Sequence, residues 1–330
     1  MKAVWFETFG DAGDVLQYGD RPTPSPQAGE VLVRLHASGP NPSDVKKRAG
    51  SFPNLLDEGY VIPHSDGAGV IEAVGEGVPS SRVGERVWVY QAQYGRRFGT
   101  AADYVAVDSA RAPVLPDAAG FEVGACLGIP VMTAHRCVFA DGPVEGQTVL
   151  VTGGAGRVGF YAIQWAAQAG ARVVATASSD EDAATCREAG AHIIVNHREA
   201  DWPAQLAERL DGGKVDRVVE VEFGANLEKV LDIIRTGGVI ATYSSSQDMS
   251  PTLPFYRMMF MDLTIRLVIV YAMPESAKQQ AIADIDAALK AGTLKHRIAK
   301  VLPLDQCAKA HRLIEQGALK GCVVLHTDAV

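Results

Sequence analysis

A glycine-rich turn is the strongest chemical feature of the sequence. The apolar run 149–152 leads into four glycines, and an apolar helix pattern and a second apolar run follow. These glycines are Gly153, Gly154, Gly156 and Gly159. A plain turn would use the same residues, but here strand, helix and second strand all occupy the places that dinucleotide binding requires. We expect a pyrophosphate at the start of the helix, where backbone N–H groups favour negative charge. The residues expected at the phosphates are Ala155, Gly156, Arg157 and Val158.

The end of the second run, ARVVATASS, indicates which dinucleotide is bound. NAD-selective sites usually place a carboxylate there, to hold the ribose 2′-hydroxyl. This chain has Ser178 and Ser179 instead, and His197 and Arg198 could add positive charge from the next loop. Hydroxyl donors and a cation suit a 2′-phosphate, so NADPH is favoured over NADH. The acidic residues 180–182 would repel that phosphate if they turned inward, but they equally suit the first turn of a helix.

Metal ligands and nucleophiles lack comparable patterns. The five cysteines are widely scattered, without the short paired spacings of zinc sites or disulfide frameworks. The histidines show no spacing that builds a ligand group or a triad with Ser and Asp. We therefore expect no metal site, and we interpret the cysteines as packing residues in a reducing cytoplasm.

The elements that must position the glycine turn change in character along the chain. Up to about residue 115, short apolar runs broken by turn residues predict a β-rich domain. From about residue 120, apolar strands alternate with amphipathic helices, which predicts a parallel sheet covered on both faces. The expected class is therefore α/β. We expect a β-rich catalytic domain over residues 1–122, a nucleotide domain over 123–267, and a segment 268–330 that returns to the first domain.

Composition excludes several classes of protein. The net charge of −8, without long runs of like charge, argues against a nucleic-acid surface. The N-terminus does not resemble a signal peptide, and no apolar stretch approaches the length of a membrane helix. A cytoplasmic protein is expected, with a small molecule as its partner and no role at a membrane.

Several motifs, taken with the glycine turn, resemble one family over nearly all of the chain. They are NPSDVKKRAG at 41–50, IPHSDGAGVIEAVGEGV at 62–78, GTAADYVAV at 99–107, GIPVMTAHR at 128–136 and RTGGVIATYSSS at 235–246. The sequence resembles the quinone oxidoreductase and zeta-crystallin-like branch of the medium-chain dehydrogenase/reductase superfamily. The resemblance implies a GroES-like β-rich catalytic domain, a Rossmann domain with a doubly wound parallel sheet, and an active site in the cleft.

The resemblance also implies catalysis without zinc. Zinc-dependent relatives carry a cysteine ligand where this chain reads Gly39-Pro40-Asn41, and a Gly-His-Glu pattern where it reads His64-Ser65-Asp66. Their loop of four closely spaced cysteines has no counterpart here. His64 and Asp66 form an imperfect metal pair at best.

The resemblance further implies roles for single residues. Asn41 and Asp44 are the expected catalytic residues, although a turn with Asp44 capping the following helix explains the same letters. Relatives often carry a tyrosine where this chain has Lys46. We expect Lys46 to lie at the cofactor in its place, and we expect the substrate type to differ from that of these relatives. The other residues expected at the cofactor are Thr133, Tyr243, Ser244, Ser245, Leu267, Val268 and Ile269. A hydroxyl-rich loop such as 243–246 is also an ordinary turn.

These features predict an NADPH-dependent, zinc-independent reductase that passes hydride to a quinone or a related activated enone. Three alternatives stay open at this point: an enal or enoyl-thioester reductase, a zinc alcohol dehydrogenase, and a non-enzymatic NADPH-binding protein. The segment LTIRLVIVY reads as a strand at the end of the nucleotide sheet, where the family pairs two subunits. An internal strand would explain the same letters, and a homodimer is our hypothesis.

Overall fold

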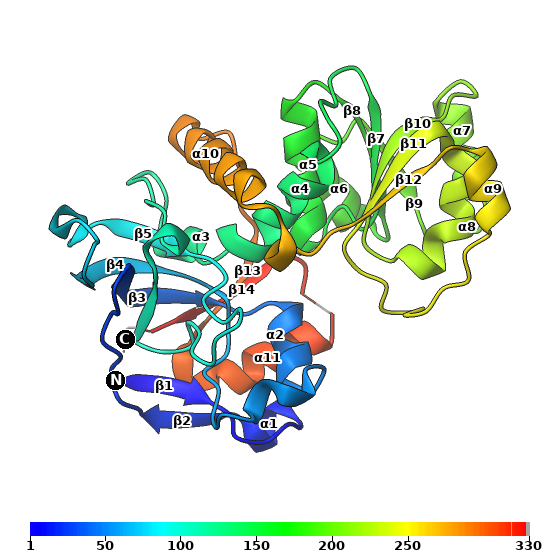
Figure 1. Cartoon of the computed structure of the whole chain (residues 1–330). Helices are drawn as coiled ribbons and strands as arrows, with labels where there is room; N and C mark the ends of the chain where they lie inside the picture. Colours follow the sequence, from blue (N-terminus) through cyan, green and yellow to red (C-terminus); the bar gives the residue numbers. More distant parts are fainter. Residues whose placement is uncertain (318, 328–330) are drawn as a thin grey trace. The chain divides into compact units, whose positions relative to one another are not determined.

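The computed structural model describes residues 1–317 and 319–327. Two compact units make up the chain (Figure 1). The first unit contains Met1–Ile129 and the segment from Ile282 onward, and the second contains Pro130–Ala281. The assignment of residues 1–122, 123–267 and 268–330 to separate domain segments stays a prediction.

The second unit is built on a six-stranded sheet in which every pairing is parallel, in the order β12-β11-β10-β7-β8-β9. Figure 1 shows α5 and α6 on one face of this sheet and α7 and α8 on the other. Strands covered on both faces need continuous apolar runs, such as VVATA in β8, rather than an alternating pattern. The strands are β7 (Thr148–Val151), β8 (Arg172–Ala177), β9 (Ile193–Asn196), β10 (Val215–Glu220), β11 (Ile234–Thr242) and β12 (Thr264–Leu267).

The order of these strands defines where a ligand would bind. From β7 the chain moves outward through β8 to β9, then crosses back to β10 on the other side of β7. In open parallel sheets, ligands bind at the carboxyl ends of the strands where the order reverses, here between β7 and β10. The helices of this unit are α4 (Met132–Phe139), α5 (Arg157–Gln168), α6 (Asp180–Ala189), α7 (Trp202–Arg209), α8 (Phe223–Ile233) and α9 (Phe255–Phe260).

The first unit contains a β-rich fold whose main sheet runs β13-β14-β3-β4-β5, with β6 also paired to β3. The C-terminal strand β14 pairs antiparallel with β3, so the end of the chain completes the sheet of the N-terminal segment. Gly69 lets β3 and β4 approach, because a Cβ there would lie 2.0 Å from the carbonyl oxygen of Arg34. The strands are β1 (Lys2–Trp5), β2 (Gln17–Asp20), β3 (Glu30–Gly39), β4 (Asp66–Val74), β5 (Arg86–Val89), β6 (Tyr104–Asp108), β13 (Ile298–Pro303) and β14 (Cys322–His326).

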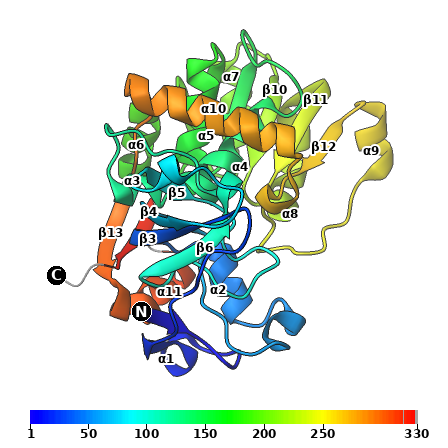
Figure 2. The same cartoon turned by 60° about the vertical axis from the view of Figure 1, so that its left-hand side comes forward.

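Short helices complete the first unit, as the turned view in Figure 2 shows for α2 and α11. Its helices are α1 (Ala12–Val15), α2 (Pro42–Arg48), α3 (Phe121–Gly124) and α11 (Cys307–Glu315), while α10 (Glu275–Ala291) spans the division between the units. The α/β class expected from the sequence is confirmed. Among the described residues, no helix combines the length and the apolar character that crossing a membrane requires.

Candidate functional site

The glycine turn lies at the point where the strand order reverses. Gly156 is the residue before α5, so the first backbone N–H groups of this helix face the end of β7. Gly153 adopts a φ of +61°, in the left-handed region that favours glycine. Two hydrogen bonds join the turn to Thr176 of β8. The N–H of Gly153 donates to Oγ1 of Thr176 at 2.9 Å, and the N–H of Gly154 donates to the carbonyl oxygen of Thr176 at 3.0 Å. The result is a rigid helix N-terminus of the kind that binds phosphate.

Close packing explains why two of these positions need glycine. A Cβ on Gly159 would lie 2.4 Å from the carbonyl oxygen of Gly153. A Cβ on Gly154 would lie 2.8 Å from Sγ of Cys186 in α6 and 2.9 Å from Cβ of Ala175 in β8. The turn therefore has no space for side chains. Among the other residues expected at the phosphates, Ala155 is buried, and Arg157 and Val158 are half-buried.

A buried carboxyl group beside the turn was missed by the sequence reasoning. Glu220 ends β10, is fully buried, and accepts hydrogen bonds from Oγ1 of Thr152 at 2.9 Å and from Nδ2 of Asn226 at 2.9 Å. Burial raises its pKa, and the repulsion from Glu222 adds to this effect. Its position after a buried strand, opposite β7, was the only available signal. Glu220 therefore holds Thr152, the residue directly before the glycine turn, in place.

The residues expected at the 2′-phosphate cluster at the end of β8. Ser179 caps α6, because its side chain accepts from the N–H of Asp182. Ser178 donates to Oδ2 of Asp182 at 3.0 Å. The acidic residues 180–182 thus form the first turn of α6, and Asp182 is held by both serines. His197 and Arg198 are exposed in the loop after β9, where the N–H of His197 donates to the carbonyl of Ala177 at 3.2 Å.

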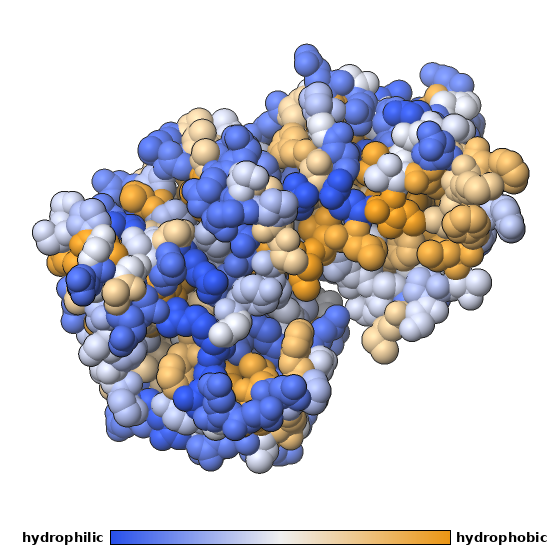
Figure 3. Space-filling model, viewed as in Figure 1, coloured by the Kyte–Doolittle hydropathy of each residue, from blue (hydrophilic) through white to orange (hydrophobic). Residues whose placement is uncertain are grey.

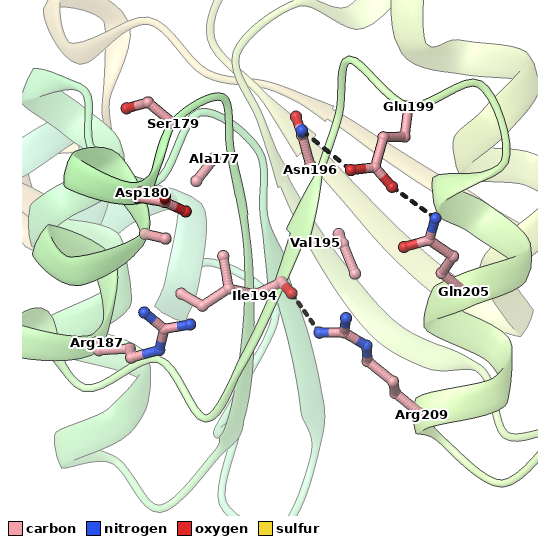
Figure 4. A pocket seen from close by; sticks show the side chains of 11 residues that line it. Ala177, Ser179, Asp180, Arg187, Ile194, Val195, Asn196, Glu199, Gln205 and Arg209 are labelled. Carbon is pink, nitrogen blue, oxygen red and sulfur yellow. Dashed lines mark hydrogen bonds between the residues drawn. The ribbon is translucent and has the colours of Figure 1, made fainter.

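A pocket of about 390 Å³ adjoins these residues. Ala177, Ser179 and Asp180 line it from the end of β8. Figure 4 shows Arg187 and Arg209 on either side of Ile194, and Arg209 donates to the carbonyl of Ile194 at 2.6 Å. The sequence reasoning missed these two arginines, since they belong to different helices and meet only at the edge strand.

The remaining residues expected at the cofactor in this unit are distributed over three segments. Thr133 is buried in α4. Tyr243, Ser244 and Ser245 follow β11, and Oγ of Ser245 accepts from the N–H of Gly224 at 2.9 Å, so this loop also holds its own conformation. Burial raises the pKa of the Tyr243 phenol well above its usual value, although part of the side chain is exposed. Beyond β11, Val268 is buried, whereas Leu267 and Ile269 are 78% and 56% exposed.

In the first unit, the structure joins Asn41 to a buried carboxyl group. Nδ2 of Asn41 donates to Oδ2 of Asp66 at 2.8 Å and to the carbonyl of Gly39 at 3.0 Å. The N–H of Ile129 donates to the same Asp66 oxygen at 2.8 Å. Burial raises the pKa of Asp66 well above its usual value, and Asp44 adds repulsion. Asn41 is thus fixed with both amide hydrogens engaged.

Asp44 lies in the first turn of α2, where its Oδ2 accepts from the N–H of Asn41 at 2.8 Å. Of the two following lysines, Lys46 is exposed and Lys47 is buried. Nζ of Lys47 donates to Oε1 of Gln93 at 2.9 Å, and burial lowers its pKa while Asp44 and Asp66 oppose that shift. The sequence reasoning selected Lys46 and overlooked Lys47, because a helical pattern this short does not define which of two adjacent lysines faces inward.

Comparison with known proteins connects these features to one family. A model of the alcohol dehydrogenase GroES-like domain matches residues 27–117, and a model of zinc-binding dehydrogenases matches residues 158–287. Quinone oxidoreductase from Rattus norvegicus is 30% identical to the chain over 329 residues, which is 98% of this chain and 97% of the relative. The chain belongs to the quinone oxidoreductase branch of the medium-chain dehydrogenase/reductase superfamily. The expected GroES-like and Rossmann folds are confirmed.

Two further members of this superfamily inform the interpretation. A 2-haloacrylate reductase from a Burkholderia species is 30% identical over 316 residues, which is 92% of this chain and 93% of the relative. A mycobacterial protein solved in complex with NADPH has a TM-score of 0.88 and 27% identity, and the match covers 99% of this chain and all of that chain. The family relation makes the protein an oxidoreductase.

Proposed function

We propose that this protein is a zinc-independent, NADPH-dependent reductase that transfers hydride to a quinone or a related activated enone. The observation that carries the proposal is the glycine turn of residues 153–159 at the reversal point of the sheet, in a chain of this superfamily. NADPH, when bound, supplies hydride from its nicotinamide. The protein must bind the cofactor, orient the acceptor and exclude water.

The turn fits the pyrophosphate of NADPH, because its glycines place no side chains over the backbone N–H groups and the N-terminus of α5 is positive. Ser178, Ser179, His197 and Arg198 recognise the 2′-phosphate. Thr133, the loop 243–245 and the segment 267–269 bind the nicotinamide half, and Lys46 contributes from α2.

A catalytic zinc ion does not fit the residues around Asp66. Oδ2 of Asp66 already accepts from Asn41 and Ile129, and the neighbouring Gly39-Pro40-Asn41 and Ser65 offer neither thiolate nor imidazole. Hydride arriving at one carbon of a quinone moves negative charge onto oxygen. A hydrogen-bond donor and a solvent proton can complete that reaction without a metal.

Asn41 and Asp44 orient the acceptor and cofactor in this proposal. Asp44→Asn tests the catalytic role separately from the structural one, since asparagine retains an oxygen that can accept from the N–H of Asn41. A fall in kcat of at least about 10-fold with unchanged thermal stability would support a catalytic carboxylate. Unchanged kinetics and cofactor affinity would limit Asp44 to a structural role in the first turn of α2.

The decisive experiment follows the oxidation of NADPH and NADH by absorbance, using chelator-treated protein and a panel of quinones, enals, enoyl thioesters and 2-haloacrylates. We expect NADPH loss that depends on a quinone and is unaffected by the chelator. Cofactor binding without turnover on any acceptor would refute the enzymatic proposal.

A second candidate function, the reduction of another activated double bond, is favoured by the similarity to 2-haloacrylate reductase. Turnover confined to the non-quinone acceptors would establish it.

We further propose a cytoplasmic homodimer. All five cysteines are buried and lie outside disulfide bonds in the described structure, which suits a reducing compartment. Strand β12 ends the sheet, and α9 before it exposes four large apolar side chains, which we call the apolar edge surface (Figure 3). They are Phe255, Tyr256, Met259 and Phe260, the last 79% exposed. The outer edge of a terminal strand, beside such a surface, suits pairing with a second copy.

A further inference from the structure

Three side chains with metal-binding atoms meet inside the first unit, and the proposed reaction uses none of them. Nε2 of His64 lies 2.9 Å from Nε2 of His311 and 3.7 Å from Sγ of Cys307. All three atoms lie within 4.8 Å of one another. The residues are at most 1% exposed, so bulk water does not reach them.

Two features of the backbone bring these atoms together. Cys307 and His311 are four residues apart in α11, so they share one face of the helix. His64 adopts a φ of +78°, in the left-handed region that side chains other than glycine rarely occupy. Strained residues of this kind persist where their surroundings enforce them and are frequent at functional sites. Here the strained backbone carries an imidazole that contacts α11.

The hydrogen bonds of His64 leave its Nε2 lone pair directed at that helix. Thr100 donates its hydroxyl hydrogen to the carbonyl of Asp66 at 2.5 Å, so Ser38, 2.9 Å from Oγ1 of Thr100, must donate to Thr100. Ser38 therefore accepts from Nδ1–H of His64 at 2.8 Å. Metal-binding histidines are oriented in this way, with one ring nitrogen fixed by a hydrogen bond and the other free to coordinate.

His311 is incompletely satisfied by hydrogen bonds. Its Nε2 must donate to Nε2 of His64, which leaves its Nδ1 as a buried nitrogen without a hydrogen-bond partner among the described residues. Buried polar atoms are nearly always paired, so a His–His hydrogen bond alone explains the cluster poorly. A coordinated ion would use the lone pairs of both Nε2 atoms and place the hydrogen of His311 on Nδ1.

We propose that His64, Cys307 and His311 bind copper(I) through Nε2, Sγ and Nε2. Thiolate and imidazole are ligands that this soft ion favours. Binding forms three metal–ligand bonds and releases the thiol proton of Cys307 to solvent, so the buried ion and thiolate carry no net charge, which limits the cost of desolvation. Zinc(II) would leave a net positive charge and normally takes a fourth ligand. The two nitrogens need to separate by roughly 0.5 Å to hold an ion at bond lengths of about 2 Å.

Copper binding is tested on the full-length, reduced and chelator-treated protein under anaerobic conditions. Protein is loaded with copper(I) both by incubation in mild urea, which lets α11 open, and by refolding, and a copper(I) chelator removes loosely held metal. We expect roughly one copper per chain, with sulfur and nitrogen neighbours in X-ray absorption. Cys307→Ser and His311→Gln should retain less than about a tenth of it. The matched control is Cys126→Ser, because Cys126 is equally buried but donates to the carbonyl of Glu122 at 3.2 Å.

His64→Gly separates ligand loss from misfolding. Glycine adopts a φ of +78° without strain, so this variant should show the wild-type circular dichroism spectrum and bind no copper. The proposal is overturned if wild-type protein retains no copper after both loading procedures, if His64→Gly or Cys307→Ser retains as much as wild type, or if the site selects zinc over copper.

Discussion

Asn41 and Asp66 share a hydrogen bond of 2.8 Å in the interior of the first unit, where Asn41 is 3% exposed and Asp66 is completely buried. The carboxyl group accepts a second bond from Ile129 through the same oxygen. Burial nevertheless dominates, and it raises the pKa of Asp66 well above 3.8. The carboxyl group that holds Asn41 is therefore protonated over a wider pH range in the folded protein than in the unfolded chain.

This shift predicts a pH-dependent stability difference between wild type and Asp66→Asn. Above pH 3.8 the unfolded chain loses the Asp66 proton while the folded protein keeps it. Wild-type stability relative to the variant should then fall as pH rises, by up to about 1.4 kcal/mol per pH unit, until the folded-state pKa is passed. Thermal unfolding of both proteins from acidic to neutral pH measures this difference.

Asp11 provides a control in which the pKa shift, and therefore the pH dependence of stability, has the opposite sign. Its carboxylate is exposed, and the N–H of Gly13 and the side chain of Arg312 lower its pKa. Asp11→Asn should lose stability relative to wild type as pH rises through the titration range of Asp11. A pH-independent difference for Asp66→Asn would show that folding does not raise the pKa of Asp66.

Local features of the sequence were sufficient to predict the glycine turn and its neighbours. Gly159 packs against the carbonyl oxygen of Gly153 within the same turn and helix, so this spacing directly reflects local geometry, whereas Gly154 also packs against α6 and β8. The strands of the parallel sheet were similarly visible as continuous apolar runs. Pattern and structure agree where the deciding contacts lie within one strand-turn-helix unit.

Contacts between distant segments were not predictable in this way. His64 and Cys307 are 243 residues apart, and the histidines nearest to His311 in the sequence, His296 and His326, are each 15 positions away. The pairing of Asn41 with Asp66 likewise depends on how β3 and β4 align. Such clusters need the sheet register before they can be identified.

Gly159→Ala should weaken NADPH binding. The added methyl group would lie 2.4 Å from the carbonyl oxygen of Gly153 and push α5 away from the turn. We expect the Kd for NADPH to rise about 10-fold or more, with a loss of roughly 1–3 kcal/mol in stability from overpacking. Fluorescence titration and thermal unfolding report the two effects. Gly120→Ala is the control, because its φ is −71° and its new methyl group would meet only the flexible end of Glu122, at 3.0 Å. Wild-type NADPH affinity in Gly159→Ala would contradict the assignment of the turn.

Arg198→Ala should reduce the preference for NADPH over NADH. Loss of one charge-assisted hydrogen bond to the 2′-phosphate would raise the Kd for NADPH by roughly 10-fold and leave that for NADH unchanged. Arg187→Ala and Arg209→Ala are matched controls, since both arginines line the neighbouring pocket. If Arg187→Ala or Arg209→Ala lowers the preference and Arg198→Ala does not, the phosphate lies in the pocket of Figure 4 and not at the loop after β9.

Phe260→Glu should convert the proposed homodimer into monomers. Phe260 is 79% exposed on the apolar edge surface beside the terminal strand β12, so a dimer that covers this surface would bury two uncompensated carboxylates. The dimer dissociation constant should rise at least about 100-fold, which sedimentation velocity measures across a dilution series. Val83→Glu is the control, because Val83 is an exposed apolar residue of the first unit, whereas β12 and α9 belong to the second unit. A wild-type protein that is monomeric at all concentrations would exclude the dimer. A dimer that tolerates Phe260→Glu as well as Val83→Glu would place the interface elsewhere.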